Sequence, residues 1–276
     1  MVKIDSHQHF WQYHPVNHQW ISDEMSVLKQ DFLPGQLSDL LTIHGFEGTV
    51  AVQADQSEAE TEFLLNLAKQ YPFIKGVVGW VDLQASDVEQ RLEYFQRYPK
   101  LKGFRHVVQS EPDDSFLLRE AFLGGVAKLA RYHYTYDILI YPRQLPATLL
   151  FVNQFPDQKF VVDHIAKPNI KAGDFEKWGE LMQELSQYPN VWCKVSGMVT
   201  EADWRQWTPA DFERYIEHVF SCFGPERIMF GSDWPVCLLA ASYSQVVEIF
   251  DTFTSGLPWE AQNKVWGGNA RSFYQL

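Results

Sequence analysis

Eight short apolar stretches rich in β-branched residues recur along the chain, and longer polar or amphipathic segments separate them. They lie at 2–10, 49–55, 74–83, 101–109, 135–141, 159–168, 191–198 and 227–235. Strands that alternate with helices in this way favour a parallel sheet, because each return to the next strand requires a crossover. Eight such units predict the α/β fold class and, within it, a closed (β/α)8 TIM barrel.

Helical periodicity is readable in several of the intervening segments, namely 58–71, 115–133, 175–188 and 209–223. An open doubly wound sheet is the rival arrangement. The first stretch is not followed by a G-x-G-x-x-G turn, and no G-x-x-x-x-G-K phosphate loop is present. The length of 276 residues suits one barrel, and no repeat, low-complexity tract or linker divides the chain. We therefore expect a single domain over residues 1–276.

One connection is much longer than the others. Residues 10–35 carry no clear helical period, and four aromatic side chains lie in the first eleven positions. Long loops in compact domains are usually functional or disordered, and aromatic residues argue against disorder. This loop follows the first strand, at the end of the barrel where active sites lie. We expect it to form a wall or lid over the active site.

The charge balance limits the classes of partner. The formal net charge is −12, which repels phosphate backbones and anionic lipid, so we expect neither nucleic acid nor membrane as a partner. No apolar run approaches the length of a membrane span, and the N-terminus lacks an apolar signal-peptide core. The three cysteines form no C-x-x-C pair. This usage is typical of reduced thiols, and a cytoplasmic location is expected.

The first stretch carries polar side chains where a buried strand normally has none. Asp5, His7 and His9 alternate along it and should share the face directed into the barrel, with Ile4 and Phe10 on the other face. Burying such groups without partners is unfavourable. Two imidazoles in an H-x-H pair at a strand end can also reach one common atom. A functional role is therefore favoured over a structural one.

Polar residues end several other stretches at the same level: Gln53, Asp55, Arg105, His106, Asp163, His164, Lys194, Ser196 and Asp233. A barrel that gathers such groups at one end is usually building a site. Asp233 faces the first strand across the barrel closure, so function is favoured there, and also at His164. Asp163 should point to the opposite side of its strand from His164, and it is expected to anchor a loop or helix. Other histidines and Trp80 are interpreted as structural.

Five motifs, taken in order, are together specific. They are D-x-H-x-H at 5–9, G-x-R-H-V at 103–107, D-H-x-x-K-P at 163–168, C-K-x-S-G at 193–197 and G-S-D-W-P at 231–235. With the terminal GGNARSFY segment, they resemble the amidohydrolase superfamily over nearly the whole chain. The resemblance is greatest to its sugar-lactonase branch, the L-fuconolactonase-like and pyrone-dicarboxylate-lactonase-like proteins.

The resemblance implies a distorted barrel and hydrolysis at a carbonyl, with Asp233 as general base and His164 as a second catalytic residue. Dinuclear members of the superfamily carry a bridging lysine or carboxylate on strand four and a histidine on strand five. Here Arg105 and His106 end the fourth stretch, and the fifth, DILIYP, lacks a histidine. A dinuclear centre is therefore not expected. One zinc ion bound by His7 and His9, with Asp233 and His164, and metal-independent action both remain open.

A lactone is an activated ester, so it needs a base for water, electropositive groups at the carbonyl and a proton for the leaving alkoxide. The sequence has no G-x-S-x-G elbow for a serine mechanism. The substrate-binding residues expected for a sugar lactone are Arg105, His106, Lys194, Trp11 and Trp20. A mononuclear metal-dependent decarboxylase of the same superfamily is the first alternative, and a non-catalytic ligand-binding barrel is the second. The number of subunits is open, and a homo-oligomer is one expectation.

Overall fold

The computed structural model describes all 276 residues and contains one eight-stranded parallel sheet in the order β1 to β8. The strands are β1 Lys3–Gln8, β2 Phe46–Val52, β3 Ile74–Gly79, β4 Leu101–His106, β5 Thr135–Ile138, β6 Phe160–Val162, β7 Val191–Val195 and β8 Ile228–Phe230. The sheet closes on itself, because Gln8 forms a parallel bridge with Trp234 just beyond β8. The predicted (β/α)8 barrel is therefore confirmed.

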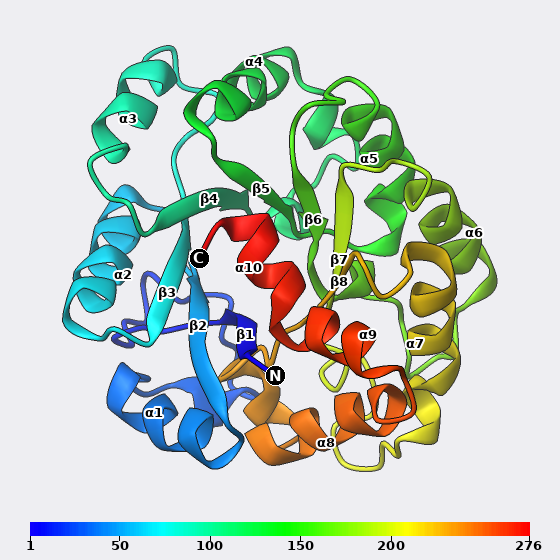
Figure 1. Cartoon of the computed structure of the whole chain (residues 1–276). Coiled ribbons are helices and arrows are strands. Elements are labelled where there is room, and N and C mark those ends of the chain that lie inside the picture. The colour runs from blue at the N-terminus through cyan, green and yellow to red at the C-terminus, as the bar shows by residue number, and fades with distance from the viewer.

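Helices surround the strands (Figure 1). They are α1 Pro34–Ile43, α2 Glu58–Gln70, α3 Val88–Phe95, α4 Glu120–Leu129, α5 Leu145–Val152, α6 Glu176–Leu185, α7 Ala210–Phe223 and α8 Tyr243–Thr254, followed by α9 Trp259–Asn263 and α10 Asn269–Tyr274. The single helix predicted at 115–133 is shorter than expected. It is divided into 3-10 turns at Phe116–Leu118 and Ala130–Tyr132 on either side of α4. No helix is both long and apolar enough to cross a membrane.

Two apolar cores hold the layers together. The larger, of 68 buried residues, includes side chains of both strands and helices. The smaller, of nine buried residues, joins Ile4 and other strand side chains to Phe273 and Tyr274 of α10. In Figure 1 α10 lies in front of the strands, so it covers the amino-terminal end of the barrel. The carboxyl end is left for the functional site, as in other barrels of this kind.

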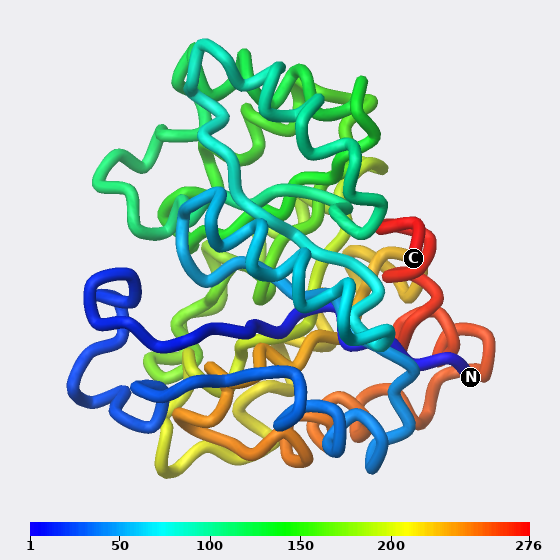
Figure 2. Tube along the Cα trace, turned by 90° about the vertical axis from the view of Figure 1, so that its left-hand side faces the viewer, coloured from blue at the N-terminus to red at the C-terminus, as the bar shows by residue number.

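The long first loop is ordered by its own contacts. Trp11 and Phe32 pair as a short antiparallel bridge, with N–O distances of 3.0 and 2.9 Å. The indole of Trp11 donates to the carbonyl of Gln30 at 2.9 Å. Figure 2 shows this loop, in dark blue, on the side of the molecule opposite the two termini. It therefore lies at the carboxyl end of the strands, where the sequence predicted a wall or lid.

The first strand does not keep the alternation predicted for it. Its pairing with β2 shifts register on both sides of the Ile4–Asp5 pair. Ile4 packs in the small core inside the barrel, whereas Asp5 accepts a hydrogen bond from Tyr243 of α8 at 3.2 Å. Asp5 also accepts from the backbone of Ser232 at 2.9 Å, and its burial raises its pKa to about 6. The prediction that Asp5 faces the interior is therefore wrong; this carboxylate holds β1 to the segment after β8.

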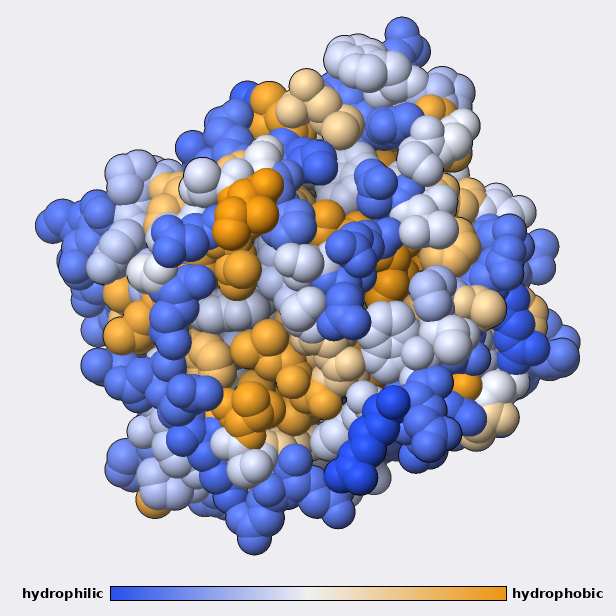
Figure 3. Space-filling view, turned by 90° about the horizontal axis from the view of Figure 1, so that it is seen from below, coloured by the Kyte–Doolittle hydropathy of each residue, from blue (hydrophilic) through white to orange (hydrophobic).

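Apolar residues also gather on the outer side of the barrel that carries α1 and α8, with polar residues around them (Figure 3). Patches of this kind occur on monomers as well as at interfaces. Nothing in the structure shows what covers this one. The expected homo-oligomer therefore stays a prediction.

Candidate active site

A cavity of about 600 Å³ opens at the carboxyl end of the barrel. His9, Arg105, His164 and Asp233 line it from four different strand ends. Trp20 of the long loop lines it as well. A concave, mixed polar and apolar cavity of this size is the usual form of a small-molecule site.

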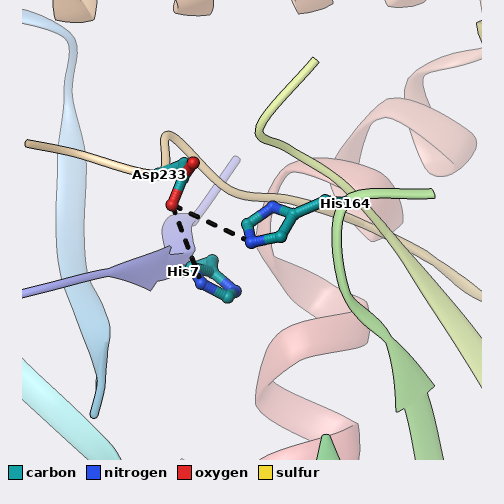
Figure 4. A group of neighbouring side chains, drawn as sticks. All are labelled: His7, His164 and Asp233. Atoms are coloured by element: carbon teal, nitrogen blue, oxygen red, sulfur yellow. Dashed lines mark ion pairs between the residues drawn. The ribbon is translucent and has the colours of Figure 1, made fainter. Parts of the chain in front are cut away.

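Asp233 is the centre of the polar groups. Its Oδ1 atom lies 3.2 Å from Nε2 of His9 and 3.9 Å from Nε2 of both His7 and His164. Figure 4 shows the imidazoles of His7 and His164 directed at this carboxylate. All four residues are at least 95% buried. Three ring nitrogens therefore face one carboxylate oxygen in a space that is largely shielded from water.

Each imidazole is oriented by a contact at its other nitrogen. Nδ1 of His9 lies 2.8 Å from the carbonyl of Val52, and Nδ1 of His164 lies 2.9 Å from the hydroxyl of Ser196. Nδ1 of His7 lies 3.2 Å from a carboxylate oxygen of Asp163. A partner at Nδ1 fixes the orientation of each ring and leaves Nε2 directed at the site, as in metal-binding histidines.

Burial decides the charge state of these groups. It lowers the pKa of His7 and of His164 well below the ordinary value for histidine, so both rings are neutral. Burial alone would raise the pKa of Asp233, but the hydrogen bond with His9 and the nearby charge of Lys167 hold this pKa below its ordinary value. The site therefore combines an ionised carboxylate at Asp233 with neutral rings at His7 and His164.

This donor set fits one divalent cation. One ligand atom from each of His7, His164 and Asp233 lies within 4.8 Å of the others. Two neutral imidazoles and one carboxylate are a common set of protein ligands for catalytic zinc. His9 directs Nε2 at the same carboxylate oxygen. The guanidinium of Arg105 lies 3.2 Å from Nε2 of His7, so Arg105 and a bound ion would compete for the single lone pair of that nitrogen.

The turn that carries His164 has an unusual backbone. The φ angles of His164, Ile165, Ala166 and Lys167 are 55°, 49°, 59° and 49°, which form a left-handed turn without glycine. Each such residue costs about 1–2 kcal/mol relative to the right-handed form. The indole of Trp178 donates to the carbonyl of Ile165 at 2.8 Å and helps to hold the turn. Strain of this kind concentrates at functional sites.

The turn also explains why Asp163 departs from its predicted outward position. Regular strand structure ends at Val162, so alternation no longer applies, and Asp163 lies buried inside the barrel. It contacts Arg105 at 3.0 Å and Lys194 at 3.1 Å, besides His7. Burial alone would raise its pKa, but Lys194, His7 and Arg105 hold this pKa well below the ordinary value. The expectation of a loop anchor is therefore replaced by a central ionic partner.

A second buried carboxylate completes this interior network. Asp137 accepts from Nζ of Lys194 at 2.6 Å and from the hydroxyl of Tyr274 at 2.7 Å. Its burial raises its pKa to about 6, although Lys194 opposes the rise. Tyr274 belongs to α10, so the network connects the closed end of the barrel with His7 below the cavity.

The structure gathers His7, His9, Arg105, His164 and Asp233 around one centre, as the sequence predicted, with His7 just beneath the cavity lining. The remaining expected substrate contacts lie differently. Trp20 lines the cavity, whereas Lys194, His106 and Trp11 do not. Lys194 is fully buried in the network beneath, and Trp11 is fully buried against Phe32 within the loop itself. Nε2 of His106 pairs with Glu111 at 2.8 Å.

Sequence reasoning missed two charged residues of the cavity wall, Lys167 and Glu201. Lys167 belongs to the D-H-x-x-K-P motif, but in a regular continuation of β6 it would not face the site. Glu201 lies in the irregular segment after β7 and has no periodic signal. Only the motif around Lys167 offered a way to find this pair.

A closed parallel barrel with histidines and a carboxylate converging in a cavity at its carboxyl end defines the class of (β/α)8-barrel enzymes. The chain belongs to the amidohydrolase family, whose model matches residues 4–276.

Two curated relatives and one solved structure match the chain over its full length. L-fucono-1,5-lactonase of Burkholderia multivorans is 41% identical, over 100% of this chain and 96% of that protein. L-fucono-1,5-lactonase of Burkholderia ambifaria is 35% identical, over 99% and 96%. A crystal structure of an amidohydrolase from Burkholderia multivorans with bound zinc is 40% identical, covers 100% of both chains and gives a TM-score of 0.97. Metal binding therefore fits this family and this donor set.

Proposed function

We propose that the protein hydrolyses a sugar-acid lactone, of the L-fuconolactone or L-rhamnonolactone type, to the open hydroxy acid, with Asp233 as the base for water. The observation that carries the proposal is the ionised Asp233 carboxylate beside the neutral rings of His7 and His164, at a cavity of ligand size. The names of the two full-length relatives, both L-fucono-1,5-lactonases, support the same substrate class.

The charges of the cavity favour a neutral substrate. Its charged lining consists of two cations, Arg105 and Lys167, and three carboxylates, Asp55, Glu201 and Asp233. Each cation already has an acidic partner: Arg105 pairs with Asp163, and Lys167 pairs with Glu201. A substrate carboxylate would find no unpaired cation on this lining. An uncharged lactone therefore suits the cavity better than the carboxylate that a decarboxylase must bind.

The reaction can be written from these residues. Asp233 takes a proton from water while the water oxygen attacks the lactone carbonyl carbon, which gives a tetrahedral oxyanion. Donors on the cavity floor, among them Arg105, stabilise the negative charge of that oxygen. When the intermediate collapses, the bond between the carbonyl carbon and the ring oxygen breaks. Asp233 then returns its proton to the leaving alkoxide, which yields the hydroxy acid.

We assign His7, His164 and Asp233, with His9 beside them, as the residues that would hold one zinc ion. A bound divalent cation supplies Lewis-acid polarisation and lowers the pKa of nearby water. On the other side of these rings, Asp163 contacts Nδ1 of His7 and Ser196 contacts Nδ1 of His164, and these contacts fix the orientation of both imidazoles.

The test is a panel of sugar 1,4- and 1,5-lactones, assayed by acid release with and without chelator and with zinc restored. Asp233→Asn keeps the shape of the side chain but removes the proton acceptor. Loss of one general base costs about 10²–10⁴-fold in rate, so kcat should fall by that factor after spontaneous opening is subtracted. Asp203→Asn, at a carboxylate whose Lys171 partner is 65% exposed, is the control. A folded Asp233→Asn protein with the parent rate would refute the proposed base.

We further propose that the chain works as one barrel domain on a free small molecule in the cytoplasm. The three cysteines are unpaired, and Cys193 and Cys237 are buried, as suits a reducing compartment. The net charge of −12 argues against nucleic acid or anionic membrane as a partner. Gel filtration with light scattering would decide whether copies of the chain associate.

A further inference from the structure

Lys167 and Glu201 form an ion pair in the wall of the cavity. Nζ of Lys167 lies 3.3 Å from Oε1 of Glu201, and the two side chains are 14% and 18% exposed. Both residues line the same cavity as Asp233 and His164. They come from different segments, Lys167 from the left-handed turn after β6 and Glu201 from the segment after β7. The pair is therefore a wall group beside the reacting centre, and the proposed hydrolysis assigns it no step.

We propose that Lys167 and Glu201 together bind neighbouring hydroxyl groups of the lactone ring and so select polyhydroxylated, uncharged lactones. The inference deepens the proposed function and rests on it. Lys167 offers only donors, and an ionised Glu201 offers only acceptors. A hydroxyl group both donates and accepts, so two adjacent hydroxyls can meet both members of the pair. Charge-assisted hydrogen bonds of this kind are about twice as strong as neutral ones.

The pairing also sets the charge that the wall presents. Burial alone would lower the pKa of Lys167, but Glu201, Tyr141 and Asp233 hold it above the ordinary value, so the ammonium stays charged. Glu201 balances this charge at short range, and Lys167 opposes the rise that burial causes in the pKa of Glu201. A wall with a donor and an acceptor but no net charge suits a polyol. A substrate carboxylate at the same place would have to displace Glu201 from Lys167.

The backbone holds the pair in a fixed position. The amide of Lys167 donates to the carbonyl of His164 at 2.8 Å, within the left-handed turn. The amide of Lys171 donates to the carbonyl of Glu201 at 2.9 Å, which joins the two segments. The ring of Tyr141 lies 5.6 Å from Nζ of Lys167, within the range of a cation–π contact. The two side chains therefore lose little conformational entropy when a ligand binds.

The same turn thus carries one residue beside the reacting centre and one residue of the cavity wall. His164, at its start, faces Asp233, and Lys167, three residues later, faces Glu201. A ring whose hydroxyls are held by the wall pair has its carbonyl placed relative to Asp233 and His164 by the same rigid unit. Positioning of this kind raises the reaction rate, because even small displacements of the reacting atoms lower that rate strongly.

The test compares the substrate preferences of two forms of the enzyme on a set of lactones. The parent and Lys167→Met are assayed on L-fucono-1,5-lactone, or the lactone opened fastest in the panel, and on versions lacking one ring hydroxyl. The parent should prefer the full lactone about 10- to 100-fold in kcat/KM over the version lacking a contacted hydroxyl. In Lys167→Met that preference should fall below about 3-fold. Preferences at hydroxyls that the pair does not touch should stay unchanged.

Lys171→Met is the matched control. Lys171 also pairs with an acid of the segment after β7, Asp203, at 3.0 Å, but it is 65% exposed and does not line the cavity. Its variant should keep every preference of the parent. If Lys167→Met keeps them too, or loses the same factor on every substrate, the inference is overturned. If the parent opens no lactone, the proposed function fails, and that outcome is distinct from both.

Glu201→Gln provides a second variant in case Lys167→Met does not fold. It removes the balancing charge and leaves the Lys167 ammonium facing the cavity. The preference for the contacted hydroxyl should fall as in Lys167→Met. At the same time, inhibition by the open hydroxy acid, which is an anion, should become about 10-fold tighter or more. Unchanged selectivity together with unchanged inhibition by the acid would overturn the inference.

Discussion

Replacing Lys194 by methionine tests whether this residue is a substrate contact or an interior ionic partner. Its ammonium lies 2.6 Å from Asp137 and 3.1 Å from Asp163, and its side chain is fully buried. The neighbouring cation, Arg105, pairs with Asp163. Without Lys194, Asp163 would keep Arg105, whereas the buried carboxylate of Asp137 would lose its cationic partner. The expected effect is therefore a loss of stability that is present without any substrate.

The magnitude follows from the burial. Removing one partner of a buried pair costs about 3–5 kcal/mol, because the other charge is left uncompensated. For a domain of this size each kcal/mol shifts Tm by about 2–4 °C, so Lys194→Met should melt roughly 6–20 °C below the parent. Asp137 has a pKa of about 6 even with Lys194 present, so the variant can relieve part of the penalty by binding a proton there.

Because Asp137 can bind this proton, the loss of stability in Lys194→Met depends on pH. In Lys194→Met the folded pKa of Asp137 rises further above the unfolded value near 3.9, so the folded state binds more protons. Its stability should then fall as pH rises from about 4 through the folded pKa, and the deficit relative to the parent should widen. Adding Asp137→Asn removes the uncompensated charge and should recover half or more of the lost stability.

Urea and thermal unfolding of the parent, the single variant and the double variant, at pH 5 and pH 8, measure these differences. A Lys194→Met protein as stable as the parent would contradict the ionic reasoning. So would a double variant that is no more stable than the single one. If Lys194→Met unfolds like the parent but loses affinity for substrate, Lys194 is a direct substrate contact after all.

Two further predictions concern the partly buried Glu60 and the buried Gly197. Burial raises the pKa of Glu60 to about 7, so the folded chain holds that proton longer than the unfolded chain, and stability should fall as pH rises from about 4.5 to 7. Glu60→Gln should remove this slope and gain about 1–3 kcal/mol at pH 8 but little at pH 5, by urea unfolding; an unchanged slope would contradict the assignment. Gly197 has φ +62°, and an added Cβ would lie 2.4 Å from Nδ1 of His164. Gly197→Ala should therefore displace that ring and lower kcat/KM by about 10²-fold, whereas Gly124→Ala, with open space around it in α4, should keep parent activity.

The barrel could be predicted from the sequence because its signal is repeated. Each of the eight stretches carries the same apolar, β-branched composition, and each is followed by a segment long enough for a crossover. A wrong boundary at a single helix or strand does not change the number of predicted strand–helix units. The segment 115–133 shows this, because its periodicity survives in α4 although both of its ends turn into 3-10 geometry.

The side-chain directions at strand ends could not be predicted as well, because they depend on regular alternation. Register shifts in β1 reverse the expected directions of Ile4 and Asp5. The turn after β6 brings both Asp163 and His164 inward. Histidines at 7, 9 and 164 and the carboxylate at 233 were nevertheless expected together, since their positions at strand ends were enough. The partners that orient them depend on local backbone geometry, which has no periodic pattern in the sequence.

The left-handed turn at residues 164–167 shows why the chain keeps a backbone form that its sequence disfavours. Glycine would adopt these φ angles without steric cost, but it would remove the side chain. At His164 the lost group would be an imidazole facing Asp233, and at Lys167 it would be the cation paired with Glu201. Between them, Ile165 accepts from Trp178 and is fully buried, so packing stabilises the strained form. The strain is therefore the consequence of placing two functional side chains on one short, rigid turn.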